Sequence, residues 1–343
     1  MHKNTKAYCF TALLTVLINT SGPARADEEL KDRGPLYLSM SIENDNFGGN
    51  SDRYYTSGVR LTAFRAGTPV PPVIDKLADK IPTFDLNETT STFFTLGQNI
   101  YTPKDIRIAT EQPGDRPWAG FLYGSVGLTT VTWNEVVPAH IDELEFTLGV
   151  IGPPSLGEHA QKFIHKNIIA SPEPMGWDHQ LKTEPGIGIS WQRRMPFALS
   201  YDTRYFNTRI EPSFGITLGN IYTHAQTGAT LVIGSSKDLD TPSRVRPSPP
   251  GTGVFLSPKN KLNWQVFAGV DARLVGRNIF LDGNTFADSH SVDKKHLVGD
   301  ASAGISLTYN DYRLSYSLNG RSKEFHGQDE KSIYGSITLT KRF

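Results

Sequence analysis

Apolar and polar residues alternate with a period of two along most of this chain. In residues 36–42, leucine, methionine and isoleucine alternate with tyrosine and serine. The same pattern recurs in residues 144–150, 214–218, 305–309 and 314–318. Successive side chains of a β-strand point to opposite faces of the sheet. The pattern therefore predicts strands that each have one apolar face and one polar face.

The alternating segments predict twelve strands. We expect them at residues 35–45, 54–66, 91–102, 118–133, 140–151, 183–200, 207–219, 221–234, 263–277, 298–310, 311–323 and 331–343. The last strand ends the chain on Phe343, and a terminal aromatic residue is common in bacterial outer-membrane barrels. An even number of strands also suits such a barrel, with both termini on the periplasmic side. We therefore predict an all-β protein, a closed antiparallel transmembrane β-barrel, and favour it over a soluble sandwich.

The N-terminal residues are typical of an exported protein. A positively charged start precedes an apolar stretch at residues 7–18 and the small-residue sequence Ala24-Arg-Ala26. This arrangement predicts a signal peptide at residues 1–26 and an outer-membrane barrel domain at residues 27–343. The only cysteine, Cys9, would leave with the signal. A disulfide-stapled extracellular scaffold is therefore excluded.

Charge narrows the range of partners. The chain has 35 basic and 35 acidic residues and a formal net charge of zero. Proteins that bind nucleic acid usually carry a basic surface, so we expect no nucleic-acid partner. After the signal, no apolar run is long enough for a membrane-spanning helix. We expect a monomer that crosses the bacterial outer membrane with its strands.

A segment in the middle of the chain departs from the strand pattern. Ser155 and Glu158 match an S-x-x-E capping box, which predicts the start of a helix. Apolar residues at helical spacing predict one apolar face, formed by Leu156, Ala160, Phe163, Ile164 and Ile168. Gln161 and His165 are four residues apart, so they would lie one above the other along the edge of that face. We predict a short extracellular amphipathic helix, although its histidine alone would also suit a solvated loop.

The expected topology brings several polar residues to one end of the barrel. If the first strand runs outward, Asn44 and Asp45 close it at the cell surface, and Thr56 opens the second strand there. Lys104 and Arg107 follow the third strand, and the helix follows the fifth. By parity, Asn44 continues the lipid-facing side of its strand and Asp45 points inward. Polar groups at a lipid-facing rim predict a site for an amphiphile rather than for a pore ligand.

Two connections, at residues 67–90 and 235–262, are long for periplasmic turns. A short helix is possible at residues 73–81. For both connections we expect solvated linkers.

Short motifs along the chain, in order, resemble the outer-membrane lipid A 3′-O-deacylase family. They are Ser41-Ile-Glu-Asn-Asp45, Tyr54-Tyr-Thr-Ser-Gly58, Gly97-Gln-Asn-Ile-Tyr-Thr-Pro103, Gly114-Asp-Arg-Pro-Trp-Ala-Gly120, Gly149-Val-Ile-Gly-Pro153, Gln161 to His165, Phe267-Ala-Gly-Val270 and Asp282-Gly-Asn284. The resemblance covers essentially the whole mature chain. It implies a twelve-stranded barrel with a calcium-dependent esterase site on the outer rim. The implied substrate is the ester-linked 3′ acyloxyacyl group of lipid A, the anchor of lipopolysaccharide.

The resemblance also implies a set of site residues. The functional residues of the family match Asn44, Asp45, Thr56, Gln161, His165 and Glu173, in chain order. The active-site lysine of the family falls in the loop after the third strand, where Lys104 or Arg107 would contact the substrate.

Elementary chemistry suggests a role for each of these residues. The chain has no G-x-S-x-G sequence and, after processing, no cysteine, so a directly activated water is the simplest hydrolytic route. His165 suits the general base. Gln161 would orient the water or donate to the oxyanion, and Thr56 would hydrogen-bond the metal site or the substrate. Oxygen ligands of the kind that calcium prefers are offered by Asp45, Asn44 and Glu173.

Two other functions remain open from the sequence. An outer-membrane phospholipase would need a serine nucleophile, and Ser57 is the nearest serine on the rim. A small passive barrel or channel would need no catalytic residues.

Overall fold

The computed structural model describes residues 34–48, 54–65, 67–78, 80–81, 83–84, 86–135, 137–169, 171–236 and 261–343. The predicted signal peptide lies outside these residues, as does most of the connection predicted at 235–262. No helix in the described ranges is long and apolar enough to cross a membrane.

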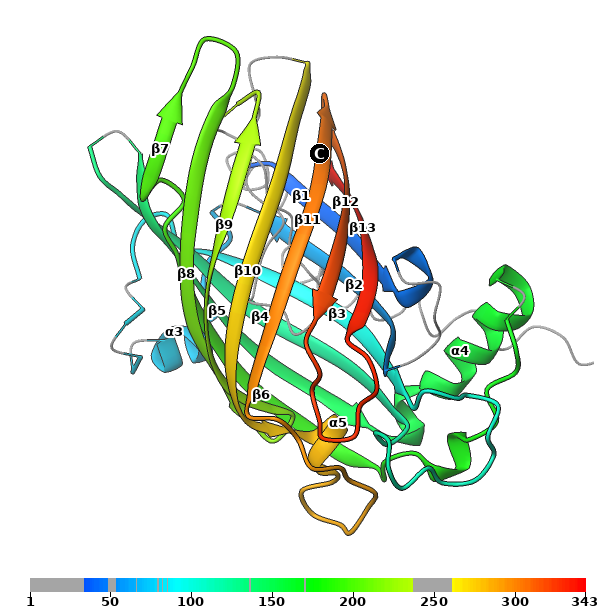
Figure 1. Ribbon diagram of the computed structural model, residues 1–343. Coiled ribbons are helices and arrows are strands. Elements are labelled where there is room, and N and C mark those ends of the chain that lie inside the picture. The colour runs from blue at the N-terminus through cyan, green and yellow to red at the C-terminus, as the bar shows by residue number, and fades with distance from the viewer. Residues whose placement is uncertain are drawn as a thin grey trace, which may run out of the picture.

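The described strands form one closed barrel wall. Its long strands are β1 (Leu36–Asn44), β2 (Tyr54–Arg65), β3 (Ser91–Thr102), β4 (Ala119–Trp133), β5 (Pro138–Ile151), β6 (Glu184–Arg194), β8 (Asn207–Gly219), β9 (Tyr222–Gly234), β10 (Leu262–Asn278), β11 (Leu297–Tyr309), β12 (Tyr312–Arg321) and β13 (Ser332–Arg342). Each pairs antiparallel with its neighbours, and β1 pairs with β13 while β6 pairs with β8. The sheet therefore closes on itself, and the predicted fold is confirmed (Figure 1).

One predicted strand is divided in two. The expected strand at residues 183–200 stops at Arg194, and a short additional strand, β7 (Leu199–Asp202), pairs only with the start of β8. Pro196 lies in the turn between them. Because proline has no N–H to donate, it ends the ladder at this point. The result is a twelve-stranded barrel with one extra strand on a hairpin.

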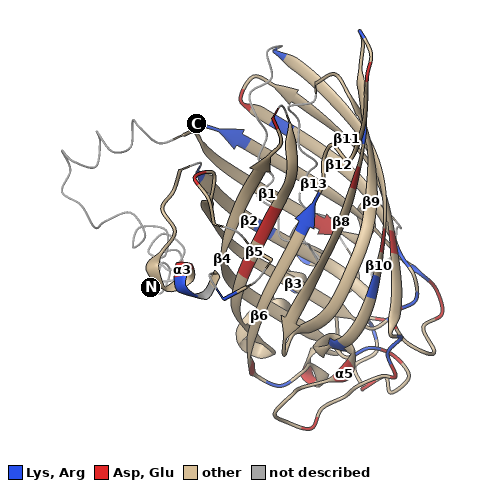
Figure 2. Ribbon diagram, turned by 90° about the vertical axis from the view of Figure 1, so that its left-hand side faces the viewer, with Lys and Arg blue, Asp and Glu red and all other residues tan. Residues whose placement is uncertain are grey.

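The two faces of the wall differ as the alternation predicts. On β1 the inward-facing Ser39 and Ser41 exchange hydroxyl hydrogen bonds of 2.9 Å with Thr340 and Thr338 of β13. The outward-facing Leu38 and Met40 of the same strand are apolar and exposed. Charged residues occur on the strands as well as in the loops (Figure 2). On the inner face they pair, as Arg60 does with Glu145 at 3.1 Å.

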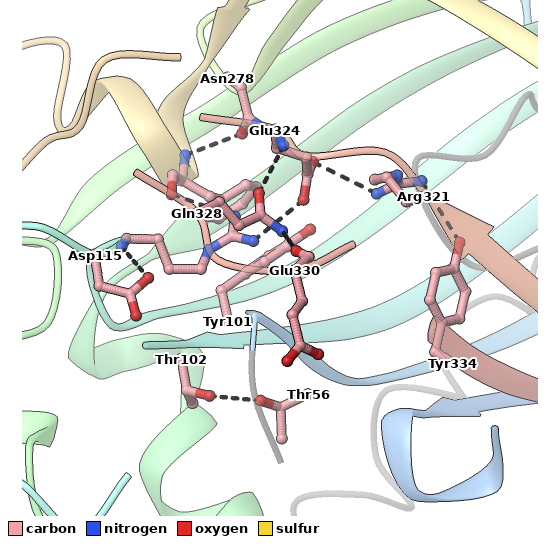
Figure 3. Close-up of polar contacts among 12 residues, drawn as sticks. Thr56, Tyr101, Thr102, Asp115, Asn278, Arg321, Glu324, Gln328, Glu330 and Tyr334 are labelled. Carbon is pink, nitrogen blue, oxygen red and sulfur yellow. Dashed lines mark hydrogen bonds and ion pairs between the residues drawn. The ribbon is translucent and has the colours of Figure 1, made fainter. Parts of the chain in front are cut away.

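Aromatic rings fill the lumen near the end where the predicted site residues lie. Phe280 of the short helix α5 (Ile279–Asp282) stacks on Tyr101 with ring centroids 4.0 Å apart. Tyr55 contacts the same tyrosine at 5.6 Å, and the Arg116 guanidinium lies 4.8 Å from its ring centroid. The carboxylate of Glu324 lies beside this cluster, 3.3 Å from Arg116 (Figure 3). A lumen packed in this way does not resemble an open channel.

We expect the purified protein to pass negligible current across a planar lipid bilayer, because α5 and its aromatic partners close the lumen. Replacing Phe280 by alanine should create a cavity there and raise the conductance. The matched control is Phe286, which lies in the same connection between β10 and β11 as α5 but is 75% exposed. Its alanine variant should still pass negligible current. Open-pore conductance by the parental protein would instead support the channel alternative.

The connection at residues 67–90 is not a solvated linker. It contains helix α3 (Pro72–Ala78), and Ala78 and Phe84 pack against Leu128 and Leu144. These two leucines face away from the lumen, on β4 and β5, and are fully buried. The prediction of a solvated segment is wrong here because its apolar residues cover part of the outer wall.

Candidate functional site

Asn44 joins the ends of two strands at the rim. It is the last residue of β1 and caps a single turn of 3-10 helix, η1 (Asp45–Phe47). Its Oδ1 accepts from the Asn46 N–H at 2.9 Å, and its Nδ2 donates to the backbone carbonyl of Thr56 at 3.0 Å. Asn44 continues the outward face of β1, as parity predicts. The next residue, Asp45, has a carboxylate-bearing side chain that is only 1% exposed.

Thr56 lies at an irregularity in the pairing of β2 with β3. The register shifts between Tyr55 and Ser57, so Thr56 is the extra residue of a bulge. A bulge re-aims the side chains around it. The hydroxyl of Thr56 lies 2.7 Å from that of Thr102, the last residue of β3 (Figure 3). The ends of three neighbouring strands are thus linked through side chains at this rim.

The predicted helix is present, but it begins differently from the prediction. A 3-10 turn, η2 (Pro153–Ser155), precedes α4 (Gly157–Ile164). The N-cap is Leu156 in a left-handed conformation with φ 60°, and it makes no side-chain cap bond. The Ser155 hydroxyl instead donates to the carbonyl of Gly152 at 2.6 Å, and Glu158 pairs with Lys162 at 2.8 Å. The predicted capping box is wrong because the two prolines impose a separate turn.

The buried side of α4 is also not the predicted apolar face. Gly157, Gln161 and His165 are the buried residues, whereas Leu156 is 52% and Phe163 61% exposed. The side chain of Ile168 lies outside the described part of the chain. A Cβ on Gly157 would lie 3.0 Å from the Cα of Gly120 on β4. This close backbone approach, together with the packing of Ala160 against the cluster of Ile106, Trp118 and Trp177, sets which side of α4 is buried.

Helix α4 packs against β3 and β4 and stands outside the barrel (Figure 1). A π-helical turn, η3 (His165–Ile169), continues it. Gln161 is 1% exposed, and its Oε1 accepts from the indole N–H of Trp177 at 2.8 Å. His165 is 4% exposed, and its Nδ1 lies 2.6 Å from the carbonyl of Pro172. A carbonyl can only accept, so Nδ1 carries the hydrogen and Nε2 is the basic nitrogen of the neutral ring.

Three predicted site residues have exposed side chains and are not among these buried groups. The Glu173 side chain is 71% exposed, and its carboxylate lies 4.0 Å from the Lys162 amine. In the loop between β3 and β4, Lys104 is paired with Asp329. Arg107 makes two hydrogen bonds to the carboxylate of Asp105, at 2.9 and 2.8 Å. These bonds lower the pKa of Asp105 to about 2. The predicted roles of Glu173, Lys104 and Arg107 remain predictions.

The oxygen atoms at the rim are of the types that bind a hard cation. Asn44, Asp45 and Thr56 offer amide, carboxylate and hydroxyl oxygens, the ligand types that calcium prefers. Across the described ranges, no three side chains of His, Cys, Asp or Glu gather closely enough to hold a metal ion by themselves. A cation at this rim would therefore need amide, hydroxyl, backbone or water oxygens in addition to the Asp45 carboxylate.

Sequence reasoning missed two residues that the structure places at the site. Thr102 contacts Thr56, and Trp177 holds Gln161. Thr102 stands at the end of its predicted strand on the same rim, so topology alone could have indicated it. The bond from Trp177 had no signal in the sequence, because it depends on how two loop segments fold together.

The closed barrel, its polar inner face, its apolar outer face and its external helix define an integral outer-membrane protein. A family model described as outer membrane protein LpxR matches residues 10–343. The chain belongs to the LpxR family of outer membrane proteins, which confirms the family predicted from the motifs and the predicted location.

One solved structure shows the same fold. LpxR from Salmonella typhimurium is 24% identical, with a TM-score of 0.72, over 90% of this chain and 100% of that chain. The β domain of the Bordetella autotransporter BrkA is 10% identical, with a TM-score of 0.40, over 91% of this chain and 98% of that chain. The second likeness is too remote to support an argument. No curated protein sequence matches the chain.

Proposed function

We propose that this protein hydrolyses the ester that links the 3′ acyloxyacyl group to lipid A in the outer leaflet. The observation that carries the proposal is the placement of a buried histidine and glutamine on a helix outside the barrel, beside an outward-facing polar rim. A substrate embedded in the leaflet reaches such a site from the side, whereas a soluble substrate of a channel would enter the lumen. Membership of the LpxR family supports the same activity.

In the proposed mechanism, His165 Nε2 removes a proton from a water molecule as the water oxygen attacks the ester carbonyl carbon. The carbonyl of Pro172 holds the ring through Nδ1 and stabilises the imidazolium that forms. The Gln161 amide donates a hydrogen bond to the developing oxyanion. When the tetrahedral intermediate collapses, the C–O bond to the sugar breaks. The imidazolium then returns its proton to the departing alkoxide, which leaves as the free sugar hydroxyl.

We also propose that calcium assists this reaction, with Asp45 and Asn44 as ligands and Thr56 hydrogen-bonding the same site. Bound there, the ion would supply Lewis-acid polarisation of the ester carbonyl. Glu173 is the further ligand proposed from the family pattern. Its exposed carboxylate would have to turn away from Lys162 to join the others. Lys104 and Arg107, on a neighbouring loop, are the candidates for contact with the anionic headgroup.

The decisive experiment compares lipid A from cells with and without this protein by mass spectrometry. The proposal expects lipid A species that have lost the 3′ acyloxyacyl group only where the protein is present. Purified protein should be incubated in parallel with phospholipid vesicles. Cleavage of phospholipid with intact lipid A would support the phospholipase alternative and Ser57. Cleavage of neither lipid would contradict an esterase.

A further inference from the structure

The hydrogen bond between Trp177 and Gln161 fixes which way the glutamine amide points. An indole N–H can only donate, so the atom 2.8 Å away must be the amide oxygen of Gln161. The NH₂ group of the same amide therefore points away from Trp177. Both side chains are almost completely buried, at 2% and 1% exposed. Neither residue can exchange this bond for a bond to bulk water without moving.

The Nε2 atom of Gln161 is buried and has no hydrogen-bond partner within the described residues. Leaving a buried donor unsatisfied is unfavourable, and such groups in native structures call for an explanation such as a catalytic role. A 180° rotation of the amide would not help, because it would set NH₂ against the indole N–H. The amide is thus held with its donor group presented to a partner that is not part of the chain described here.

Trp177 is itself held firmly. It belongs to a 3-10 turn, η4 (Trp177–His179), and its ring packs against that of Trp118, with centroids 5.2 Å apart. A Cβ on Gly157 would lie 2.9 Å from the Trp177 ring, so the indole fits closely over the start of α4. Backbone hydrogen bonds of 2.8 Å tie both flanks of the turn to the β3–β4 loop, from Met175 to Ile106 and from Leu181 to Trp118. The indole N–H therefore has little freedom to turn away from Gln161.

We propose that Trp177 is a positioning residue for hydrolysis, which locks the Gln161 amide so that its NH₂ donates to the carbonyl oxygen of the ester. This inference rests on the proposed function. Gln161 would touch the substrate, and Trp177 would act only through Gln161. A glutamine without this lock could present its oxygen as readily as its NH₂, and an oxygen would repel the developing oxyanion.

The test replaces Trp177 by phenylalanine, which keeps an aromatic ring and removes the N–H. Deacylation of lipid A should fall by at least about tenfold, mainly in kcat, because loss of an oxyanion donor typically costs about 10²–10³-fold. Trp118→Phe is the matched control. Trp118 is equally buried and belongs to the same ring pair, but its indole nitrogen has no hydrogen-bond partner within the described residues. Its variant should stay within about twofold of the parental rate.

A double-mutant cycle separates positioning from general packing. In a Gln161→Ala background, Trp177→Phe should have no further effect on kcat. Three results would each overturn the proposal. Trp177→Phe could keep parental activity, the two tryptophan variants could lose equal activity, or Trp177→Phe could lower kcat as much in the Gln161→Ala background as in the parental protein. If the parental protein leaves lipid A intact, the proposed function itself fails, and that outcome is distinct from all three.

Nuclear magnetic resonance of indole ¹⁵N-labelled protein in detergent gives a readout that needs no hydrolysis. The Trp177 N–H signal should exchange slowly with water, and Gln161→Ala should shift it and accelerate its exchange. The Trp118 signal should change little. If the Gln161→Ala variant folds normally and its Trp177 signal is unchanged, the proposed hydrogen-bond lock is wrong.

Discussion

Replacing His165 by glutamine should lower lipid A deacylation by about 10²–10⁴-fold, the range typical of losing a general base. Glutamine is close to histidine in size, and its NH₂ can still donate to the Pro172 carbonyl that His165 contacts at 2.6 Å. It has no basic nitrogen that could take a proton from water. Export, heat-modifiable gel mobility and the β-rich circular dichroism spectrum should be unchanged, since these report the barrel rather than α4.

His159 and His179 are the rival histidines and serve as controls. Both are exposed, and neither belongs to the buried side of α4. Their glutamine variants should hydrolyse lipid A at close to the parental rate. A loss confined to one of them would move the base to that residue. Full activity in all three single variants would show that histidine does not activate the water.

The barrel could be predicted from the sequence because a membrane barrel imposes one simple pattern on every strand. Alternation placed Ser39 inward and Leu38 outward on β1, and both positions agree with the structure. Parity also put Asn44 on the outward side of β1, where it ends the strand at the rim, whereas Asp45 belongs to the 3-10 turn that follows, so its inward direction stays a prediction. The structure departs from this pattern in two places. A proline ends a strand early, as at Pro196, and a connecting segment packs on the outer wall, as Phe84 does.

The helix was predicted less well than the strands, for a physical reason. The sequence pattern assigns Phe163 to the packed face because apolar residues normally bury themselves. In the structure Phe163 is exposed and Gln161 is buried. Packing of Gly157 against Gly120 and Trp177 places Gln161 and His165 on the buried side of α4. Burial of polar groups at a functional site breaks the hydrophobic pattern, so the pattern alone could not locate this face.

Replacing Asp45 by asparagine should raise the calcium concentration needed for half-maximal deacylation by at least about tenfold, because ligand charge sets calcium affinity. Asp45 is only 1% exposed, so bulk water cannot readily replace its carboxylate at a bound ion. Chelation should stop the parental enzyme and added calcium should restore it. Asp288→Asn, which changes an exposed aspartate in the loop between β10 and β11, should leave the calcium response as it was.

A stability measurement makes the same prediction testable without any substrate. A ligand that binds only the folded state raises the unfolding temperature in proportion to the logarithm of its concentration above Kd. Calcium should therefore raise the unfolding temperature of the parental protein and of Asp288→Asn, and should raise that of Asp45→Asn much less.

If the enzyme keeps full activity in excess chelator, the ion has no part in the reaction. His165 and Gln161 would then have to polarise the ester and activate the water without it. If calcium stabilises Asp45→Asn as strongly as the parental protein, the ion binds at oxygen atoms away from this rim, and the proposed ligand set is wrong.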